Sequence, residues 1–486
     1  MNPYQILPFR FKKLNGKVFI ANEVGEFLFL EDNNFSDFVN YRLKPSQNIF
    51  LNLKSKQMLT DTEIVPVIKM LGVKYRTKKG FLKHFTSLHM VVPTLRCNSK
   101  CRYCQVSSKQ LDNKGFDMTK ETAKRTVDII FKSPSPIIKI EFQGGEPLLN
   151  MDIVKYIVEY AKKLNLQHRK YLEFVVCTNL SLITSNILKY FKKHNIYVST
   201  SLDGPKDLHN ANRPLQNLDK SYMIVVENIK KAQSMLGLDK VSALMTTTRE
   251  SLSRFPEIVD EYIERGFNHV FFRALNPYGF AHKDKLIFEY TTEEYAEAYV
   301  KVLDYIIDIN IKGKYFVEGF AALLLTRILT PFSTGFVDMQ SPSGAGISGA
   351  LYNYDGNVYA SDEGRMLASV GDHRFLLGNV IKNTYKEIFY GDAIKEIVNV
   401  SCLECLPNCS DCAYQTFCGS DPIRNYSETG DLIGNHTTSS VCKKNKVIIA
   451  YLLKLIHEND TRVMNTFWSW LTHRSLIVEN HIECEA

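Results

Sequence analysis

The stretch CNSKCRYC, residues 97–104, places three cysteines in a C-x3-C-x2-C spacing within one short loop. Three thiolates in a tight loop suit a cubane cluster of four irons, because they leave one iron without a protein ligand and free to chelate a small molecule. A structural zinc site is the main alternative, but it takes four ligands, and no fourth Cys or His lies near in the sequence. We therefore predict that Cys97, Cys101 and Cys104 are metal ligands.

Short apolar runs alternate with amphipathic segments on both sides of this loop. Strands apolar on both faces and joined by helices indicate a parallel sheet with right-handed crossovers, in which chemistry collects where the strands end. The predicted fold class is α/β, a partial (βα)6 barrel open on one side. The expected strands are 88–92, 137–142, 172–177, 197–202, 241–245 and 269–273, and the expected helices are about 119–132, 151–164, 184–193, 222–235 and 252–265.

Polar and glycine-rich motifs follow the later strands of this predicted barrel. Two adjacent glycines allow a ligand to approach the backbone closely, and a hydroxyl with a guanidinium can hold a carboxylate by charge-assisted hydrogen bonds. For Asp203-Gly204-Pro205, beyond the fourth strand, a plain strand-to-helix turn is the alternative explanation. The candidate binding residues, in strand order, are Gln143, Gly144, Gly145 and Glu146, then Asn179, then Ser201 and Arg213.

Together these motifs resemble radical S-adenosylmethionine (SAM) enzymes that carry a SPASM-type cysteine-rich extension. Anaerobic sulfatase maturases and many maturases of ribosomally made peptides belong to that group. The resemblance implies a 4Fe–4S cluster on Cys97, Cys101 and Cys104, with SAM as the cofactor that yields a 5′-deoxyadenosyl radical. It also implies that SAM is bound by the residues that follow the later strands: Gln143, Gly144, Gly145, Glu146, Asn179, Ser201 and Arg213.

Longer segments narrow the resemblance to the radical SAM maturase of the His-Xaa-Ser repeat system. Among them are LPFRF, NEVGEFLFL, IEFQGGEPLLN and YNYDGNVYASDEGRML. This implies a precursor peptide with His-Xaa-Ser repeats, a second radical SAM maturase as partner, and an electron donor such as flavodoxin or ferredoxin. Two other functions stay open: maturation of a sulfatase-type Ser or Cys, and a non-catalytic iron–sulfur scaffold that carries substrate to a partner enzyme.

A second group of cysteines lies near the C-terminus. Cys409, Cys412 and Cys418 match the C-x2-C-x5-C signature of SPASM domains, and with Cys442 they make four ligands for one auxiliary 4Fe–4S cluster. Zinc is the alternative, because four thiolates at this spacing suit it too. Ser361 and Pro422 stand where that family usually has cysteine, so we expect a second auxiliary cluster to be missing, with Cys402 and Cys405 as spare thiols.

Composition shifts along the chain predict its domains. Residues 1–85 suggest a three-stranded meander at 10–12, 18–21 and 26–30 followed by helices near 34–43 and 61–71, which resembles a winged-helix-like peptide-recognition element; a small capping domain is the alternative. The remaining units are a radical SAM barrel (86–280), a helical connection (281–349), a SPASM-like domain (350–445) and a helical tail (446–486).

Three further expectations come from the residues alone. Asp362 and Glu363 follow a strand that should cover the barrel mouth, so they are candidate acid–base groups, although a surface turn explains them equally well. The basic stretch 74–83 is best explained as a solvated linker, and nothing resembles a nucleic-acid-binding module despite a net charge of +8. No apolar run of membrane-spanning length and no secretory signal are present, which favours a cytoplasmic protein without a membrane partner.

Overall fold

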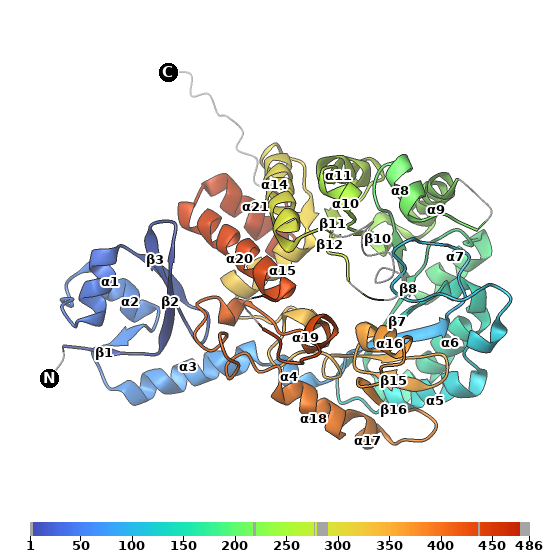
Figure 1. The fold of residues 1–486 in the computed structure, drawn as a ribbon, viewed down its shortest axis with the longest axis horizontal. Helices are drawn as coiled ribbons and strands as arrows, with labels where there is room; N and C mark the ends of the chain where they lie inside the picture. Colours follow the sequence, from blue (N-terminus) through green and yellow to red (C-terminus); the bar gives the residue numbers. More distant parts are fainter. Residues whose placement is uncertain (1–2, 217–219, 277, 279–289, 436–437, 477–486) are drawn as a thin grey trace.

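The protein is built around one large twisted sheet, seen in a computed structural model that describes residues 3–216, 220–276, 278, 290–435 and 438–476 (Figure 1). The sheet runs in the order β12-β10-β9-β8-β7-β6-β14-β15-β16, and β6 through β12 are parallel neighbours. Its strands are β6 (Leu88–Thr94), β7 (Ile137–Gly144), β8 (Tyr171–Cys177), β9 (Ile196–Ser201), β10 (Val241–Thr246), β12 (Phe272–Arg273), β14 (Gly349–Tyr352), β15 (Asn357–Tyr359) and β16 (Leu376–Asn379).

Helices connect successive parallel strands. Each helix packs its apolar face against the sheet. Ile157 of one helix and Ile258 of another are fully buried, and Thr119 and Thr184 accept hydrogen bonds from backbone N–H groups at the helix starts that they cap. The predicted α/β fold class is thereby confirmed. The crossover helices are α5 (Lys120–Ile130), α6 (Met151–His168), α7 (Ser185–His194), α8 (Lys206–Asn212), α9 (Ser221–Leu236), α10 (Arg249–Leu252) and α11 (Phe255–Glu264).

The last predicted strand, 269–273, is in fact two strands in two sheets. β11 (His269–Val270) pairs with β13 (Val317–Glu318), whereas β12 pairs with β10. Phe271 lies between the two strands and packs against the rings of Phe320 and Phe336.

The C-terminal third of the chain extends the same sheet. β14 pairs in parallel with β6, and β15 and β16 then continue antiparallel. The sheet is therefore continuous across residue 350, where the sequence analysis expects a domain boundary. Short helices complete this region: α16 (Asp362–Ala368), α17 (Tyr385–Phe389), α18 (Asp392–Asn399) and α19 (Pro422–Thr429).

Four longer helices cover the β12 end of the molecule. The expected helical connection and tail are present as α14 (Thr292–Ile311), α15 (Gly319–Leu329), α20 (Ser440–Glu458) and α21 (Thr461–Thr472), which pack on one another. The predicted boundary at 280/281 falls outside the described residues. Within the described part of the chain, no helix combines the length and the apolar character that crossing a membrane requires.

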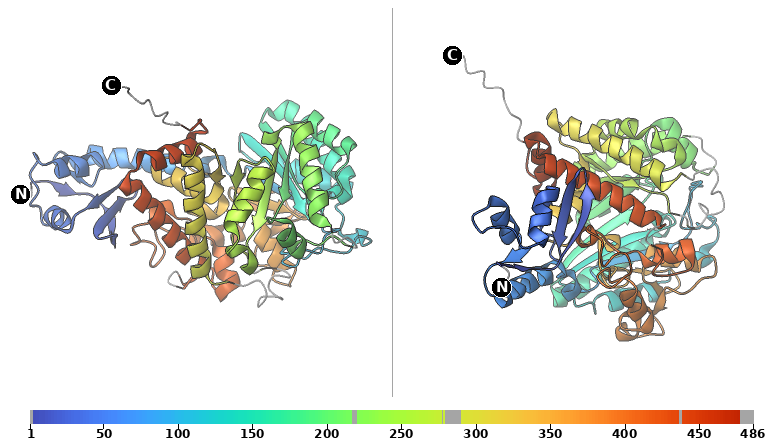
Figure 2. Two further views of the ribbon diagram at one scale, coloured as in Figure 1. Left: turned by 90° about the horizontal axis from the view of Figure 1, so that it is seen from above. Right: turned by 60° about the vertical axis from the view of Figure 1, so that its left-hand side comes forward.

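A small N-terminal unit projects from one end of the molecule (Figure 2). Its antiparallel meander has the predicted order, and one face packs on the helices around Phe38 and Phe50. The other face packs on the C-terminal region, with Phe19 against Tyr414 and Phe27 against Phe417. The elements are β2 (Phe9–Leu14), β3 (Lys17–Asn22), β4 (Phe27–Leu30), α1 (Asp32–Val39), α2 (Asn48–Ser55), α3 (Ile64–Lys78) and α4 (Phe81–His84), with β1 (Gln5–Ile6) paired to β5 (Leu59–Thr60).

The basic stretch at 74–83 corrects one expectation. It is the C-terminal half of α3 and the short helix α4, not a solvated linker. Lys79 Nζ lies 2.5 Å from Glu404 Oε1, and Lys78 Nζ lies 5.4 Å from the centre of the Phe417 ring. Burial lowers the pKa of Lys78 to about 7, so this segment forms part of an internal contact.

Candidate functional site

The three N-terminal cysteines lie on the loop that follows β6. All three are partly buried and none forms a disulfide. Backbone hydrogen bonds hold the loop in place: the N–H of Cys97 donates to the carbonyl of Lys109, and that of Lys100 to the carbonyl of Pro214. The loop is thus fixed by the chain on both sides before any metal binds.

A buried ion pair stabilises the base of the loop. Arg96 donates to both carboxylate oxygens of Asp117, from Nε at 2.8 Å and from Nη2 at 2.7 Å. Bidentate pairing of this kind fixes geometry as well as adding energy. Neither residue was identified from the sequence, because the motif gives no sign of a partner 21 positions away.

The glycine pair after β7 allows close contact between segments of the chain itself. Gly144 has φ +120°, and a Cβ there would collide with Val92 and the carbonyl oxygen of Thr94. A Cβ on Gly145 would collide with the carbonyl oxygen of Arg96. The lack of a Cβ at both glycines therefore lets the chain around the cysteine loop approach β7 closely.

Glu146 and Asn179 connect three of the strand-end loops. The Glu146 carboxylate accepts hydrogen bonds from Thr178 Oγ1 at 2.7 Å and from the Asn179 N–H at 2.8 Å. Asn179 Nδ2 in turn donates to Ser99 Oγ in the cysteine loop at 2.9 Å. Burial raises the pKa of Glu146 to about 7, although these hydrogen bonds oppose the shift.

Arg213 lies behind the cysteine loop and is bound to a buried carboxylate. Its Nε is 2.9 Å from Asp203 Oδ1, and its guanidinium lies 5.2 Å from the centre of the Tyr103 ring. The Tyr103 hydroxyl donates to the other oxygen of Asp203. Ser201 is the last residue of β9 and precedes Asp203 by two positions. Its side chain is half-buried.

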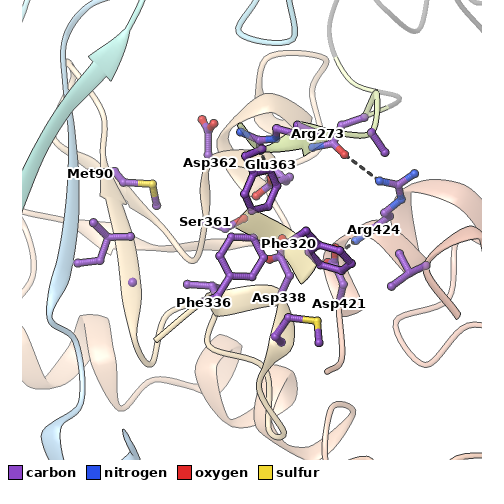
Figure 3. Close-up of a pocket in the computed structure, with 18 of the residues that line it drawn as sticks. Met90, Arg273, Phe320, Phe336, Asp338, Ser361, Asp362, Glu363, Asp421 and Arg424 are labelled. Atoms are coloured by element: carbon purple, nitrogen blue, oxygen red, sulfur yellow. Dashed lines mark hydrogen bonds and ion pairs between the residues drawn. The ribbon is translucent and has the colours of Figure 1, made fainter. Parts of the chain in front are cut away.

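A cavity of about 320 Å³ lies against β6 and the last residues of β7 (Figure 3). Gln143 contributes to its wall, and its buried Nε2 has no hydrogen-bond partner among the described residues. Asp362 and Glu363, at the start of α16, line the same cavity, which places both acid–base candidates near the glycine motif. Burial raises the pKa of Asp362 to about 6.

Charged residues that the sequence analysis did not single out complete this cavity. Because they come from segments far apart in the chain, only the tertiary fold brings them together. They are Glu141, Arg273, Asp338, Asp421, Arg424 and Lys444.

Comparison with known protein families shows which family the barrel resembles. Residues 91–262 match the Radical SAM superfamily. The chain belongs to the radical SAM superfamily. A radical SAM protein binds a 4Fe–4S cluster and SAM, and three free thiols on one loop at the strand ends fit that cluster. The predictions of an enzyme, of SAM and of a 4Fe–4S cluster are therefore confirmed.

The relatives match this chain over different lengths. Uncharacterized proteins of Methanocaldococcus jannaschii and Methanothermobacter thermautotrophicus are each 30% identical over 39% and 44% of this chain, which covers 63% and 77% of their lengths. A cysteine-type anaerobic sulfatase-maturating enzyme of Clostridium novyi is 24% identical over 76% of this chain and 98% of its own length.

Solved radical SAM structures share the fold. The enzyme anSMEcpe with bound AdoMet superposes with a TM-score of 0.63 at 19% identity, over 79% of this chain and 99% of its own. Streptococcus suis SuiB bound to the precursor peptide SuiA gives 0.54 at 13% identity, over 90% of this chain and 100% of its own.

The C-terminal cysteines of this radical SAM protein gather around a second, smaller cavity. Cys409, Cys412, Cys418 and Cys442 all line it. Within the described ranges, no group of three or more Cys, His, Asp or Glu side chains is arranged to hold a single metal ion. Cys402, by contrast, lies near Glu404 and Lys79 at the contact with α3.

Ser361 and Pro422 have structural roles where the SPASM pattern has cysteine. Ser361 caps α16 by accepting a hydrogen bond from the Gly364 N–H at 3.2 Å. Pro422 occupies the first turn of α19, where its missing N–H costs nothing. Ser361 also lines the large cavity.

Proposed function

We propose that this radical SAM enzyme modifies a residue of a ribosomally made peptide or small protein. The observation that supports this best is the position of the cavity. Gln143 of the glycine motif and the candidate acids Asp362 and Glu363 share its wall, at the end of the sheet where the cysteine loop lies. A side chain inserted there would reach the SAM end of the barrel.

In this proposal each candidate residue has one task. Cys97, Cys101 and Cys104 hold the cluster, and SAM is bound by Gln143, Gly144, Gly145, Glu146, Asn179, Ser201 and Arg213. When bound, the cluster and SAM supply a 5′-deoxyadenosyl radical. Asp362 or Glu363 would accept a proton from the oxidised substrate at a carboxylate oxygen. For Asp362, a pKa of about 6 allows proton exchange close to neutral pH.

We also propose one auxiliary 4Fe–4S cluster on Cys409, Cys412, Cys418 and Cys442. These four thiols line one cavity, and each site of a cubane then has a protein ligand. Zinc remains the alternative occupant. Such a site would stabilise the C-terminal region, because metal binding couples to local folding.

The N-terminal unit, residues 1–85, is proposed to bind the peptide. β4 is an edge strand of the meander, and an edge strand can pair with an added peptide strand. Along α3, Val65, Ile68 and Val73 are exposed, which offers an apolar surface to such a peptide. The other proposed units keep the bounds expected from the sequence: barrel 86–280, connection 281–349, SPASM-like region 350–445 and tail 446–486.

The substrate we favour is a peptide with His-Xaa-Ser repeats, handled with a second radical SAM maturase and an electron donor of the flavodoxin or ferredoxin type. Maturation of a sulfatase Cys or Ser is the second candidate, because a sulfatase-maturating enzyme matches this chain over 98% of its own length. The non-catalytic scaffold is not retained, because the radical SAM family match supports an enzyme.

Mass spectrometry after co-expression tests these functions. The wild type should change the mass of a His-Xaa-Ser peptide and release 5′-deoxyadenosine, whereas the Cys97→Ala/Cys101→Ala/Cys104→Ala variant should do neither. Cys405→Ala is the matched control, because its thiol is exposed and outside both cysteine sites. Modification of a sulfatase peptide alone would favour the second candidate, and a reduced wild type that leaves SAM intact would contradict both.

A further inference from the structure

Acidic side chains outnumber basic ones around the large cavity. Its wall includes the carboxylates of Glu141, Asp338, Asp362, Glu363 and Asp421, against the cations of Arg273, Arg424 and Lys444. Figure 3 shows several of these charged groups around the rings of Phe320 and Phe336. Because buried charges are costly unless paired, the pairing of each group decides what the cavity can accept.

Most of the cations are already bound to particular partners. Arg273 Nη2 lies 3.5 Å from Glu363 Oε1, and Arg424 Nε lies 2.9 Å from Glu428 Oε1 outside the cavity wall. Lys444 Nζ lies 4.6 Å from the centre of the Phe320 ring, which gives it a cation–π contact.

Three of the carboxylates, those of Glu141, Asp338 and Asp421, form no ion pair among the described residues, and Glu141 has the Cys177 thiol as a hydrogen-bond partner. Among the described residues, Asp338 makes neither a side-chain hydrogen bond nor an ion pair, and Asp421 accepts only the backbone N–H of Arg424 at 3.0 Å. The free Nε2 of Gln143 in the same wall is a third unpartnered polar group. Unpartnered buried polar groups in one cavity indicate a ligand that supplies their partners.

We propose that the cavity binds a positively charged side chain of the substrate, lysine, arginine or protonated histidine, with its charge at Asp338 and Asp421. This inference rests on the proposed peptide-modifying function. Asp338 releases the proton that it holds in the empty cavity when the cation binds, so that both carboxylates then supply charge-assisted hydrogen bonds. The Phe336 ring supplies a face for the cation or its aliphatic stem.

Binding of short peptides to the cluster-loaded, SAM-bound protein tests the charge preference. The probes are Ac-Gly-Xaa-Gly-NH2 with lysine, arginine, norleucine or glutamate at Xaa, titrated calorimetrically without oxygen at pH 7. We expect lysine and arginine to bind at least tenfold more tightly than norleucine, and glutamate more weakly still. Equal affinity for lysine and norleucine, or no measurable preference, would overturn the proposal.

Four variants test which residues cause the preference for lysine and arginine over norleucine. Asp338→Asn should reduce it at least fivefold, Asp338→Glu should keep most of it, and Lys444→Met should increase it by removing the competing cation. Asp392→Asn changes a fully exposed carboxylate and should have no effect. An unchanged preference in Asp338→Asn would overturn the assignment. SAM cleavage is recorded in parallel, so loss of the radical chemistry is distinguished from loss of charge selection.

Discussion

Arg213 Nε lies 2.9 Å from Asp203 Oδ1, and both side chains are buried directly behind the cysteine loop. The same carboxylate accepts the hydroxyl of Tyr103, the residue before the third cysteine. Arg213 therefore supports the loop from behind, whether or not it also contacts SAM.

The first prediction concerns this pair. Arg213→Ala leaves the Asp203 carboxylate buried without its partner, and breaking a buried pair in this way typically costs about 3–5 kcal/mol of unfolding free energy. Urea unfolding of the metal-free protein measures the loss. Arg254→Ala is the control, because Arg254 pairs with the exposed Asp207 and such surface pairs contribute at most about 1 kcal/mol. A loss of SAM affinity with unchanged stability would mean that Arg213 serves the cofactor alone.

The second prediction is a metal count. Anaerobically reconstituted protein should carry about eight irons, from two clusters of four. The triple variant at Cys97, Cys101 and Cys104 should keep about four, and so should a variant lacking Cys409, Cys412, Cys418 and Cys442. Plasma mass spectrometry gives the numbers. About twelve irons would contradict the lost inner site, and one equivalent of zinc with about four irons would assign the C-terminal site to zinc.

The third prediction addresses Arg327, which holds the loop that carries Cys418. Its guanidinium donates to the carbonyl oxygens of Thr416, Phe417 and Cys418, at 3.2, 2.9 and 2.9 Å. Arg327→Gln loses most of these contacts, so we expect the iron of the C-terminal site to fall by at least half. Arg374→Gln, which removes a surface ion pair, should keep the full count. Equal iron in both variants would show that the loop holds its shape without Arg327.

The fourth prediction links the N-terminal unit to the same loop. Deleting residues 1–85 removes the rings that cover Tyr414 and Phe417, together with the Lys79–Glu404 ion pair. We expect the truncated protein to cleave SAM but to lose iron from the C-terminal site and affinity for the peptide. Iron analysis and peptide titration on the same preparation measure both effects. Full C-terminal iron with full peptide affinity would contradict the assigned role of this unit.

The fifth prediction is a pH dependence of stability. Burial raises the pKa of Asp338 to about 8, whereas the unfolded chain ionises it near 4. Between these values the folded protein holds a proton that the unfolded chain has released, so stability falls as pH rises towards 8. Asp338→Asn should lose less stability than the wild type between pH 6 and 8. Thermal unfolding at both pH values measures this, and parallel curves for the two proteins would contradict it.

Local patterns in the sequence predicted the barrel well. The parallel strands and their crossover helices follow from apolar runs and helix caps that act within about ten residues of one another. The strands β6 to β10 lie within about two residues of their predicted bounds. The cysteine loop and the glycine motif were also identified, because each is a pattern within a few consecutive residues.

Features that depend on distant residues were not predictable in this way. The charges of Asp338, Asp421 and Lys444 meet in one cavity only because β14 and α20 bring the C-terminal third back to the barrel. The basic stretch at 74–83 looked solvated because its partner Glu404 is 325 positions away. Helix α2 was missed, and only packing of Phe50 and Leu53 in the N-terminal core reveals it.

The pairing of β6 with β14 also has a consequence during synthesis. Met90 of β6 pairs with Leu351 of β14. The first strand of the barrel therefore cannot form this pairing until a segment roughly 260 residues further along the chain has been synthesised. At about 5–20 residues per second, the ribosome needs roughly 10 to 50 s to deliver it. One side of β6 stays unpaired through that interval, and an unpaired strand edge invites association with other chains. The nascent protein therefore has most need of chaperones before its last third emerges.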